Sequence, residues 1–380
     1  MYKNTILLLV FVSFALFSCA KPSPAHFLVT PGNVDEYLSP TYTPRPIPTP
    51  FPKSKNGEIV LLLRKRFEPF EVVLLRLSNE CLQINERCGQ TGEILGVFPQ
   101  SLSQVQEVSW TKDGHKAFFW DGSASDIYVL DGDQGVFQIF KKEVPKVREN
   151  FLFSPDGQDI IFEIQKNDHE TDLVVMNSSS GNITKFDLAI SGAKHPSQWV
   201  DENTVLFWNE VSEGKGYLVD IEVYTLDVNS QSIQPFDIGR DWMETTVPVF
   251  SSDRKWIGFT ASGTVIVRNV AAGVENIVNV LSENFLWSPD SETLAIYSQN
   301  KELFTVKLDG SRLDEVYSLS ENEFLENWTW LPDGNQILLI VSDQDGNKQI
   351  GVLSIVDKAF TPLNIELLSE YDPVSFSFRP

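Results

Sequence analysis

A short frame recurs along this chain: a hydrophobic strand, a tight turn centred on Asp or Asn, and a second hydrophobic strand. In the clearest copy, residues 151–157 read Phe-Leu-Phe-Ser-Pro-Asp-Gly and residues 160–162 read Ile-Ile-Phe. The turn positions of the copies are Asn56, Asp113, Asp156, Asp201, Asp253, Asp290 and Asp333. Because a repeated sequence reflects a repeated structural unit, this frame constrains the architecture more strongly than any single residue does.

Each copy contains four apolar segments. The first alternates large side chains with others, as in residues 151–153 and 328–330, and this alternation is typical of a strand with one buried face. The third is the most regular, as in residues 126–131 and 172–177. The Asp of the turn accepts main-chain N–H groups, and a Gly after it adopts positive φ without strain. Four short strands, repeated every 37 to 57 residues without helical periodicity, predict an all-β fold, a β-propeller of seven four-stranded blades.

The two ends of the repeat array complement each other. The first copy has no strand before its turn, because residues 54–57 follow directly on a Pro-rich segment. Residues 376–380 match the pattern of residues 151–155 and stop where the Asp-Gly pair would come. We therefore predict that the C-terminal strand completes and closes the first blade, which removes two open sheet edges.

The Ser-Pro-Asp-Gly frame followed by a strand resembles the WD40-like repeat of TolB-type propellers, which also occurs in the propeller domains of prolyl-oligopeptidase-family peptidases. The resemblance covers residues 54–380 and is closest at Asp156, Asp290 and Asp333. It implies a propeller fold for this segment. In those proteins the repeat residues are structural, so the resemblance implies no catalytic or binding residue here.

The first nineteen residues are typical of an export signal. Lys3 precedes an apolar stretch, residues 6–17, that is short for a transmembrane helix. Residues 16–19, Leu-Phe-Ser-Cys, resemble a bacterial lipoprotein signal, which implies removal of residues 1–18 and lipidation of Cys19. Several acyl chains would anchor the protein to the membrane on its extracytoplasmic face, in the periplasm or at the cell surface. An ordinary signal peptide with an incidental cysteine is the alternative.

Residues 19–53 are rich in Pro, Ser and Thr and predict an extended tether without a core of its own. Outside the cytosol, Cys81 and Cys88 are candidates for a disulfide. Their Cα atoms must approach within about 7 Å, which a β-hairpin permits and a single extended strand does not. Two free thiols are the competing interpretation.

The formal net charge of -22 disfavours binding to nucleic acid or to an anionic membrane surface. The charges are scattered, as on a solvated protein surface. We predict a monomeric propeller without a nucleic-acid partner.

The sequence predicts no catalytic residue, metal site or cofactor. It contains no Gly-x-Ser-x-Gly motif, and His26, His115, His169 and His195 lack metal-ligand spacing. Two Asp-rich loops, residues 131–135 and 343–347, carry alternating carboxylates that could bind Ca²⁺. Neither has the later acid of an EF-hand, and hairpin turns favour Asp and Gly for conformational reasons.

Basic residues gather where the topology predicts one common face, because the loops between second and third strands share a face with the connections between blades. Trp242 lies beside Arg240 in a long connection and has the composition of a binding hot spot, although burial under the ring fits equally. Charges that merely flank strands for solubility are the alternative. The candidate binding face comprises Arg64, Lys65, Arg66, Lys141, Lys142, Lys146, Arg148, Arg240 and Trp242.

The leading hypothesis from the sequence is a non-catalytic, lipid-anchored propeller that binds a protein or a cell-envelope glycan. The alternative is an enzyme or glycan-processing protein with its site at the mouth of the central channel. A weaker third hypothesis is a solute or metal sensor that uses the Asp-rich loops.

Overall fold

The computed structural model divides the chain into two units, Met1–Thr43 and Pro44–Pro380. It describes residues of the second unit only: 58–67, 71–77, 93–98, 105, 108–111, 113–120, 126–141, 147, 151–167, 169–211, 220–236, 248–261, 263–308 and 313–379. The predicted signal and tether lie outside the described residues, as do Cys19, Cys81, Cys88, Lys142, Lys146, Arg148, Arg240 and Trp242.

The described residues form antiparallel sheets, and five of these sheets have four strands. The first contains β27 (Tyr371–Arg379), β1 (Glu58–Lys65), β2 (Val72–Leu77) and β3 (Glu93–Phe98). The next contains β4 (Ser109–Trp110), β5 (Lys116–Trp120), β6 (Ile127–Asp131) and β7 (Val136–Lys141). The third contains β8 (Leu152–Phe153), β9 (Asp159–Gln165), β10 (Thr171–Asn177) and β11 (Ile183–Lys185).

Two further four-stranded sheets follow the same order. One contains β12 (Ala193–Trp199), β13 (Thr204–Val211), β14 (Asp220–Asp227) and β15 (Ser232–Pro235). The other contains β23 (Glu323–Trp330), β24 (Gln336–Asp343), β25 (Lys348–Ser354) and β26 (Ala359–Pro362), and a 3-10 helix, η4 (Glu366–Ser369), leads from it to β27.

The remaining sheet has seven strands because one long strand serves two repeats. It runs through β16 (Val249–Phe250), β17 (Trp256–Ala261), β18 (Thr264–Asn269), β19 (Glu275–Trp287), β20 (Thr293–Ser298), β21 (Glu302–Lys307) and β22 (Leu313–Ser318). The first half of β19 pairs with β18 and its second half pairs with β20. This pairing accommodates the seven predicted blades, and the number of blades stays a prediction.

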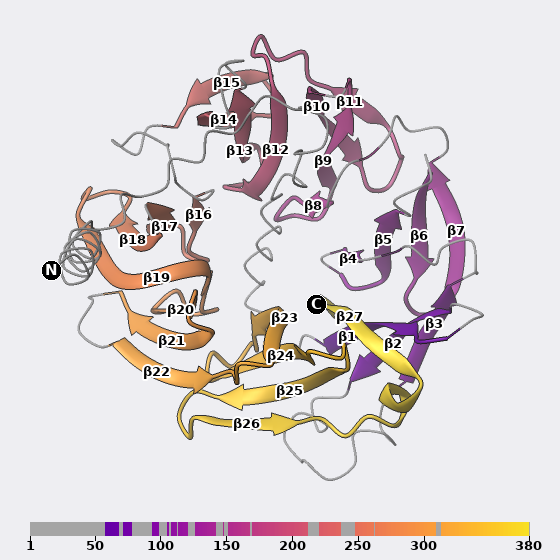
Figure 1. Cartoon of the computed structure of the whole chain (residues 1–380). Coiled ribbons are helices and arrows are strands. Elements are labelled where there is room, and N and C mark those ends of the chain that lie inside the picture. Colours follow the sequence, from indigo (N-terminus) through magenta and orange to yellow (C-terminus); the bar gives the residue numbers. More distant parts are fainter. Residues whose placement is uncertain are drawn as a thin grey trace, which may run out of the picture. The chain divides into compact units, whose positions relative to one another are not determined.

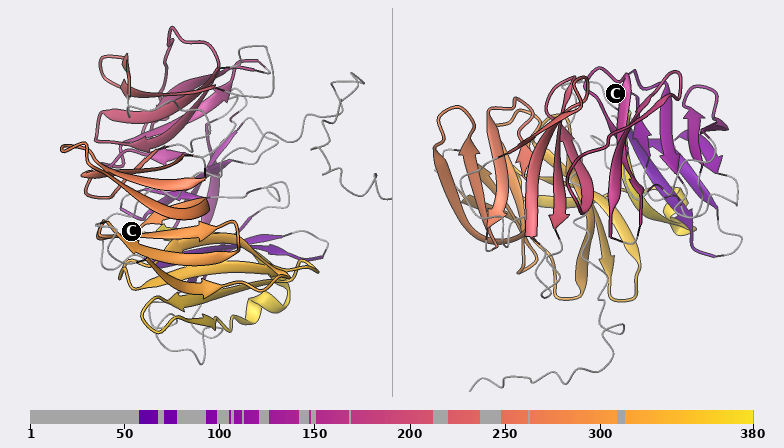
Figure 2. Two further views of the ribbon diagram at one scale, coloured as in Figure 1. Left: turned by 60° about the vertical axis from the view of Figure 1, so that its left-hand side comes forward. Right: turned by 90° about the horizontal axis from the view of Figure 1, so that it is seen from above.

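The sheets surround a common centre, with β4, β8 and β16 near it and β7, β22 and β26 far from it (Figure 1). Strands of neighbouring sheets stand side by side and run roughly along the axis of this ring (Figure 2). The all-β propeller architecture predicted from the repeats is therefore confirmed. Within the described residues, no helix has the length and apolar character needed to span a membrane.

The predicted closure of the first sheet by the C-terminus is also confirmed. Strand β27 pairs antiparallel with β1, from Glu58 opposite Arg379 to Lys65 opposite Tyr371. The closing strand begins at Tyr371, five residues before the segment that the sequence pattern identified, because the register continues past a bulge at Leu62 and Leu63.

The Asp residues of the repeat act as turn formers, as predicted. Asp156 shows the pattern: its Oδ1 accepts the main-chain N–H of Gln158 at 3.1 Å and the hydroxyl of Ser154 at 2.5 Å. The same carboxylate oxygen accepts the N–H two residues further on at the other described turn positions, which are Asp113, Asp201, Asp253, Asp290 and Asp333. Gly157 has φ 74°, so the residue after Asp occupies the left-handed region that glycine tolerates.

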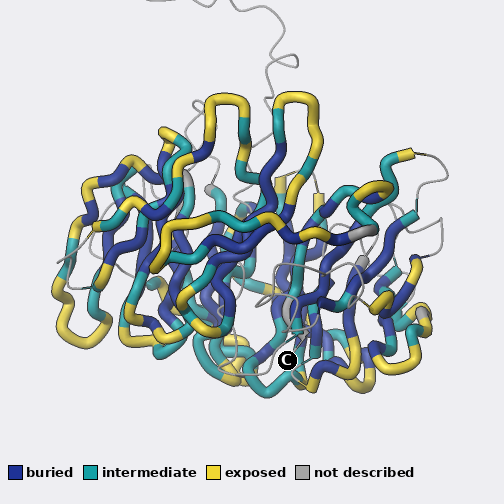
Figure 3. The backbone as a smooth tube through the Cα atoms, turned by 90° about the horizontal axis from the view of Figure 1, so that it is seen from below, coloured by how far each residue is buried: buried dark blue, intermediate teal, exposed yellow. Residues whose placement is uncertain are grey.

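The hydrophobic core lies mainly between neighbouring repeats. Most large clusters of buried side chains combine residues from two adjacent sheets, as where Leu61 and Leu63 of β1 join Leu338 and Ile340 of β24. One further cluster packs the two repeats of the seven-stranded sheet against each other, through residues of β16, β18, β19, β20 and β21. In Figure 3 the buried residues lie along the strands, and the exposed ones concentrate in the turns at both ends. Because neighbouring sheets cover both faces of most strands, side chains that differ between repeats are accessible mainly at the strand ends.

Tryptophans of the repeat belong to this core. Trp110, Trp287, Trp328 and Trp330 are buried, and Trp256 is half-buried. Several indoles also link one repeat to the repeat before it. Trp199 donates to the carbonyl of Leu152 in the preceding sheet at 2.8 Å, and Trp287 of β19 donates to that of Val249 in β16, within the seven-stranded sheet, at 3.0 Å.

Candidate functional site

The two ends of the strands form two different sides of the ring. One side carries the Asp turns between first and second strands. The other carries the turns between second and third strands, such as residues 166–170, and the connections between sheets, such as residues 186–192. We call this second side the loop-bearing face. Arg64 and Lys65 end β1 and Lys141 ends β7, so these members of the predicted binding face lie at its strand ends.

The basic residues at the end of β1 are held by different partners. The Arg64 guanidinium donates through Nη2 to the carbonyl of Val105 at 3.1 Å. Arg66 Nε lies 2.7 Å from Asp372 Oδ1. The Lys65 ammonium lies over the ring of Tyr371, 5.9 Å from its centroid. Two of these partners, Tyr371 and Asp372, come from the C-terminal strand β27.

Tyr371 brings a further acid to the same place. Its hydroxyl donates to the Glu71 carboxylate, and burial together with this hydrogen bond raises the pKa of Tyr371 to about 12. With Asp372 beside Arg66, the surface at the end of β1 is mixed in charge rather than uniformly positive. Where the structure describes it, the candidate binding face therefore presents charges of both signs.

A second group of polar residues on the loop-bearing face was missed from the sequence. It lies between the third and fourth sheets and consists of Glu163, Thr171, Lys194, His195, Asn209 and Glu210, which we call the polar junction. These residues come from the end of β9, the start of β10, the start of β12 and the end of β13. Antiparallel pairing sets Lys194 opposite Asn209 and His195 opposite Trp208.

His195 is at the centre of the polar junction. Its Nδ1 lies 2.9 Å from Glu163 Oε2, and its Nε2 lies 3.9 Å from Glu210 Oε1. The imidazole stacks on the indole of Trp208, with ring centroids 4.0 Å apart. The side chain of Glu163 is 1% exposed and that of His195 is 9% exposed, whereas that of Glu210 is 31% exposed. The histidine therefore connects a buried acid to one at the surface.

Lys194 links the two sheets through their main chains. Its Nζ donates to the carbonyls of Thr171 and Gly192, each at 3.1 Å. The Thr171 hydroxyl donates to the Lys194 carbonyl at 2.8 Å and accepts the Lys194 N–H at 2.6 Å. Burial lowers the pKa of Lys194, and the attraction of Asp172 and Glu170 opposes this effect. Asp172 itself is paired with Lys185, at 2.7 Å.

The polar junction holds most of the buried side-chain polar atoms that lack a hydrogen-bond partner within the described part of the chain. They include both carboxylate oxygens of Glu163, Nε2 of His195 and Oδ1 of Asn209. Such atoms are rare in folded proteins because each one costs free energy. Their concentration at one junction distinguishes it from the other junctions between sheets.

One signal in the sequence pointed to this site. Glu163 interrupts the apolar run at residues 160–164, and an acid in a strand buried on both sides needs a partner. The partner could not be read from spacing, because His195 and Glu210 lie on other strands and become neighbours only when two sheets pack together.

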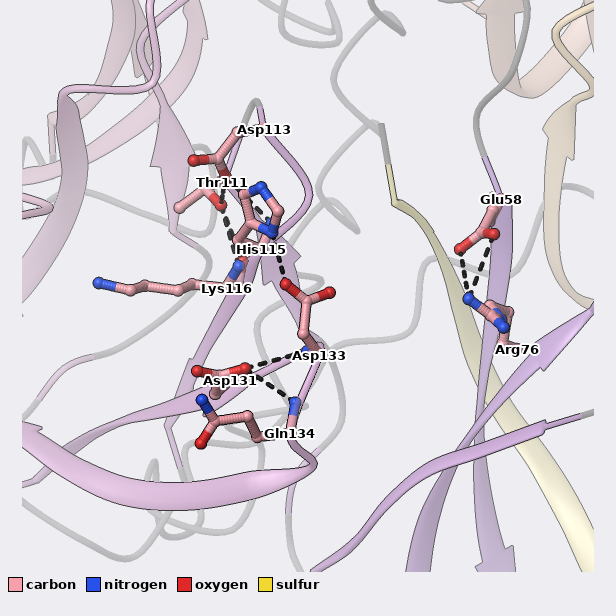
Figure 4. A network of polar contacts seen from close by, with 9 residues as sticks. All are labelled: Glu58, Arg76, Thr111, Asp113, His115, Lys116, Asp131, Asp133 and Gln134. Atoms are coloured by element: carbon pink, nitrogen blue, oxygen red, sulfur yellow. Dashed lines mark hydrogen bonds and ion pairs between the residues drawn. The ribbon is translucent and has the colours of Figure 1, made fainter.

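The Asp-rich loops lie among turn hydrogen bonds. Asp131 Oδ1 accepts the N–H groups of Asp133 at 3.0 Å and Gln134 at 2.9 Å, and Asp133 lies 2.6 Å from His115 Nδ1 (Figure 4). Asp343 accepts hydrogen bonds from the side chain and the main chain of Asn347, which lower its pKa. Across the described ranges, no three His, Cys, Asp or Glu side chains are grouped so as to hold a metal ion.

Comparison with known proteins identifies the fold. No family model matches the sequence, and no curated protein matches it. Among solved structures, an oligogalacturonate lyase in complex with manganese matches with TM-score 0.59 and 12% identity, over 81% of this chain and 88% of the lyase. A candidate 6-phosphogluconolactonase from Bacteroides fragilis matches with TM-score 0.52 and 16% identity, over 86% of this chain and 99% of that one.

TolB from Acinetobacter baumannii is also similar, with TM-score 0.47 and 16% identity, over 88% of this chain and 68% of TolB. At these identities a structural likeness identifies architecture and not activity. Together with the described sheets, the likeness to the lyase and the lactonase candidate shows that the chain has a β-propeller fold.

Proposed function

We propose that this protein is a membrane-anchored, extracytoplasmic β-propeller that binds a protein or a cell-envelope glycan through its loop-bearing face. The observation that carries the proposal is the difference between the two sides of the ring. On the Asp-turn side, the repeat residues are used for the same turn hydrogen bonds in one sheet after another. On the loop-bearing face, equivalent ends of second strands carry different residues, which are Lys65 in β1, Gln165 in β9 and Asp343 in β24.

Individual side chains on a recognition surface are expected to differ from one repeat to the next, because a single partner contacts each repeat differently. The mixed charges at the end of β1 favour a partner with charges of both signs over a simple anion. Arg66 with Asp372, and Lys65 with Tyr371, are held in defined positions and so present fixed polar groups.

The anchor in this proposal is Cys19, with residues 19–53 as the tether. The support is the sequence alone: the apolar segment at residues 6–17 ends in Leu-Phe-Ser-Cys. Replacement of Cys19 by Ala is expected to abolish incorporation of a labelled fatty acid and to move the protein from the membrane to the soluble fraction. Unchanged labelling of the Cys19→Ala protein would contradict the anchor.

The binding face is tested by site-specific cross-linking in intact cells. A photo-reactive residue replaces Lys166 on the loop-bearing face or, as the matched control, Glu292 in an Asp turn on the other side; both are exposed. We expect a discrete cross-linked product from position 166 and none from position 292. The reverse pattern would contradict the proposed face.

The alternative of a propeller enzyme is favoured by one observation, the pairing of His195 with Glu163 and Glu210. Against it, His195 Nε2 is buried, so the nitrogen that would act as a base does not contact solvent. A general base must come within hydrogen-bonding distance of its substrate. The binding function therefore fits the geometry better.

A further inference from the structure

Glu163 is a buried acid without the usual compensation. Its side chain is 1% exposed, and neither carboxylate oxygen accepts a hydrogen bond from the described residues. A carboxylate in such a position is strongly destabilising unless a cation or a proton neutralises it. Within the described part of the chain, the ionisable partner of this acid is the imidazole of His195, whose Nδ1 lies 2.9 Å from Glu163 Oε2.

The other charges around His195 are already paired or engaged. From β10, Asp172 pairs with Lys185 of β11 at 2.7 Å. On β12 itself, the Lys194 ammonium donates to two main-chain carbonyls. From β13, Asn209 contributes an amide and Glu210 a carboxylate 3.9 Å from His195 Nε2.

The two remaining strands packed against β12 contribute no titratable side chain. These are β8 (Leu152–Phe153) and β16 (Val249–Phe250). When His195 is neutral, Glu163 and Glu210 are two acids for which the described residues provide no cation. When His195 is protonated, it faces a carboxylate through each ring nitrogen.

The aromatic contact also favours a protonated ring. The imidazole and the indole of Trp208 are stacked, with planes inclined by 24°. The face of an indole attracts a cation, and this attraction is strongest where water is excluded. Trp208 is buried, so the contact satisfies that condition.

We propose that Glu163, His195 and Glu210 form a proton-operated clamp between the third and fourth sheets. The pair Glu163–His195 takes up one proton from solvent, and no covalent bond changes. The resulting imidazolium holds Glu163 of β9 through Nδ1, and Glu210 rotates in to accept the Nε2 proton. Loss of the proton leaves Glu163 uncompensated and releases Glu210, at the point where β13 ends on the loop-bearing face.

The coupling between proton binding and folding fixes how the stability contributed by the clamp changes with pH. In the unfolded chain at pH 8, Glu163 is ionised and His195 is neutral, whereas the folded clamp holds one proton more. Stability falls with rising pH wherever the folded state binds more protons than the unfolded state. The clamp is therefore strongest in mild acid, below the range near pH 6.5 where a free imidazole titrates, and weakens towards pH 8.5.

Thermal unfolding of the full chain in detergent micelles tests the clamp. The comparison uses the native protein, His195→Gln and Glu163→Gln at several pH values from 6 to 8.5, with His169→Gln as the control for an exposed histidine in a neighbouring loop. We expect the advantage of the native protein over His195→Gln and Glu163→Gln to shrink by about 2 °C or more as the pH rises. The His169→Gln curve should run parallel to the native one.

The Glu210→Gln variant distinguishes the contact of His195 with Glu163 from its contact with Glu210. It keeps the Glu163 contact and removes the acceptor for Nε2, so it should lose part of the pH dependence and little stability at pH 8.5. A Glu210→Gln protein with the full native pH dependence would contradict the role of Glu210.

The protonation state is read directly from the nitrogen chemical shifts of labelled histidines, with His195 assigned by its absence from His195→Gln. We expect imidazolium shifts for His195 at a pH where a free imidazole is neutral. If His195 gives the shifts of a neutral imidazole at that pH, or if native and variant melting curves run parallel, the clamp does not exist. The proposal is independent of the proposed binding role, since every measurement uses the protein without a partner.

Discussion

The indole Nε1 of Trp330 donates a hydrogen bond to the main-chain carbonyl of Leu286, 3.2 Å away. Trp330 ends the first strand of its sheet, and Leu286 lies in the innermost strand segment of the sheet before it. The inner strands of two sheets are thus joined by a side chain rather than by a ladder of main-chain hydrogen bonds. Trp199 makes the corresponding link to Leu152, and Trp110 links to the Ser377 hydroxyl of β27 at 3.0 Å. Trp287 makes such a bond to Val249 between the two repeats of the seven-stranded sheet.

Removal of this link should destabilise the ring without disturbing its packing greatly. Trp330→Phe keeps an aromatic ring but leaves the Leu286 carbonyl without its donor, so we expect a loss of about 1–2 kcal/mol. The matched control is Trp328→Phe in the same strand, whose indole donates no hydrogen bond to the described residues. Urea unfolding measures both, and equal losses would contradict a special role for the Trp330 indole.

The closing strand should matter more than any single side chain. Deletion of residues 374–380 removes the pairing of β1 with β27 from Leu62 to Glu58 and opens the edge of β1. We expect the free energy of unfolding to fall by more than about 4 kcal/mol, beyond the range of ordinary point mutations. Ser377→Ala, which removes only the acceptor for Trp110, is the control and should cost much less. An unchanged melting temperature after the deletion would refute closure by β27.

Acid should destabilise the Asp turns. The hydrogen bond from the Thr111 hydroxyl, aided by the main-chain N–H of His115, lowers the pKa of Asp113. A folded-state pKa below the unfolded value gives stability that is present near neutral pH and is lost as pH falls through the lower value. Asp113→Asn should therefore flatten the loss of melting temperature between pH 4 and 2. Glu292→Gln, at an exposed position, serves as the control, and a native-like acid profile in Asp113→Asn would count against the idea.

Alkali should destabilise the protein through Tyr371, because the pKa of this group is raised whereas that of Asp113 is lowered. Its pKa is raised to about 12, while tyrosine in an unfolded chain ionises near pH 10. The stabilising contribution is complete below pH 10 and disappears as pH rises through about 12. Tyr371→Phe, which cannot ionise, should lose less stability than the native protein between pH 9.5 and 11.5. Parallel urea-unfolding curves for the two proteins would show that Tyr371 is not the responsible group.

The local sequence was sufficient to predict the turns and strands that recur in each repeat. The Ser-x-Asp frame predicts its own turn, because Ser154 and Asp156 bond to each other and to main-chain groups within five residues. The alternation at residues 328–330 likewise predicts β23 and the burial of its tryptophans. The match of residues 376–380 to an incomplete repeat predicted a contact across the whole chain, because a ring leaves only one place for an unpaired strand.

The charged residues were harder to interpret, because their environment depends on partners far away in the sequence. Arg66 looked like part of a positive patch until folding set Asp372, 306 residues later, against it. Glu163 looked like an isolated acid in an apolar strand until His195 came within 2.9 Å.

The sequence by itself determined the propeller, its turns and its closure, since these follow from short-range hydrogen bonding and from hydrophobic periodicity that every repeat carries. Only the tertiary structure decided which charges meet on the loop-bearing face. Electrostatic energy depends on distance and burial, and both are set when one sheet packs against the next.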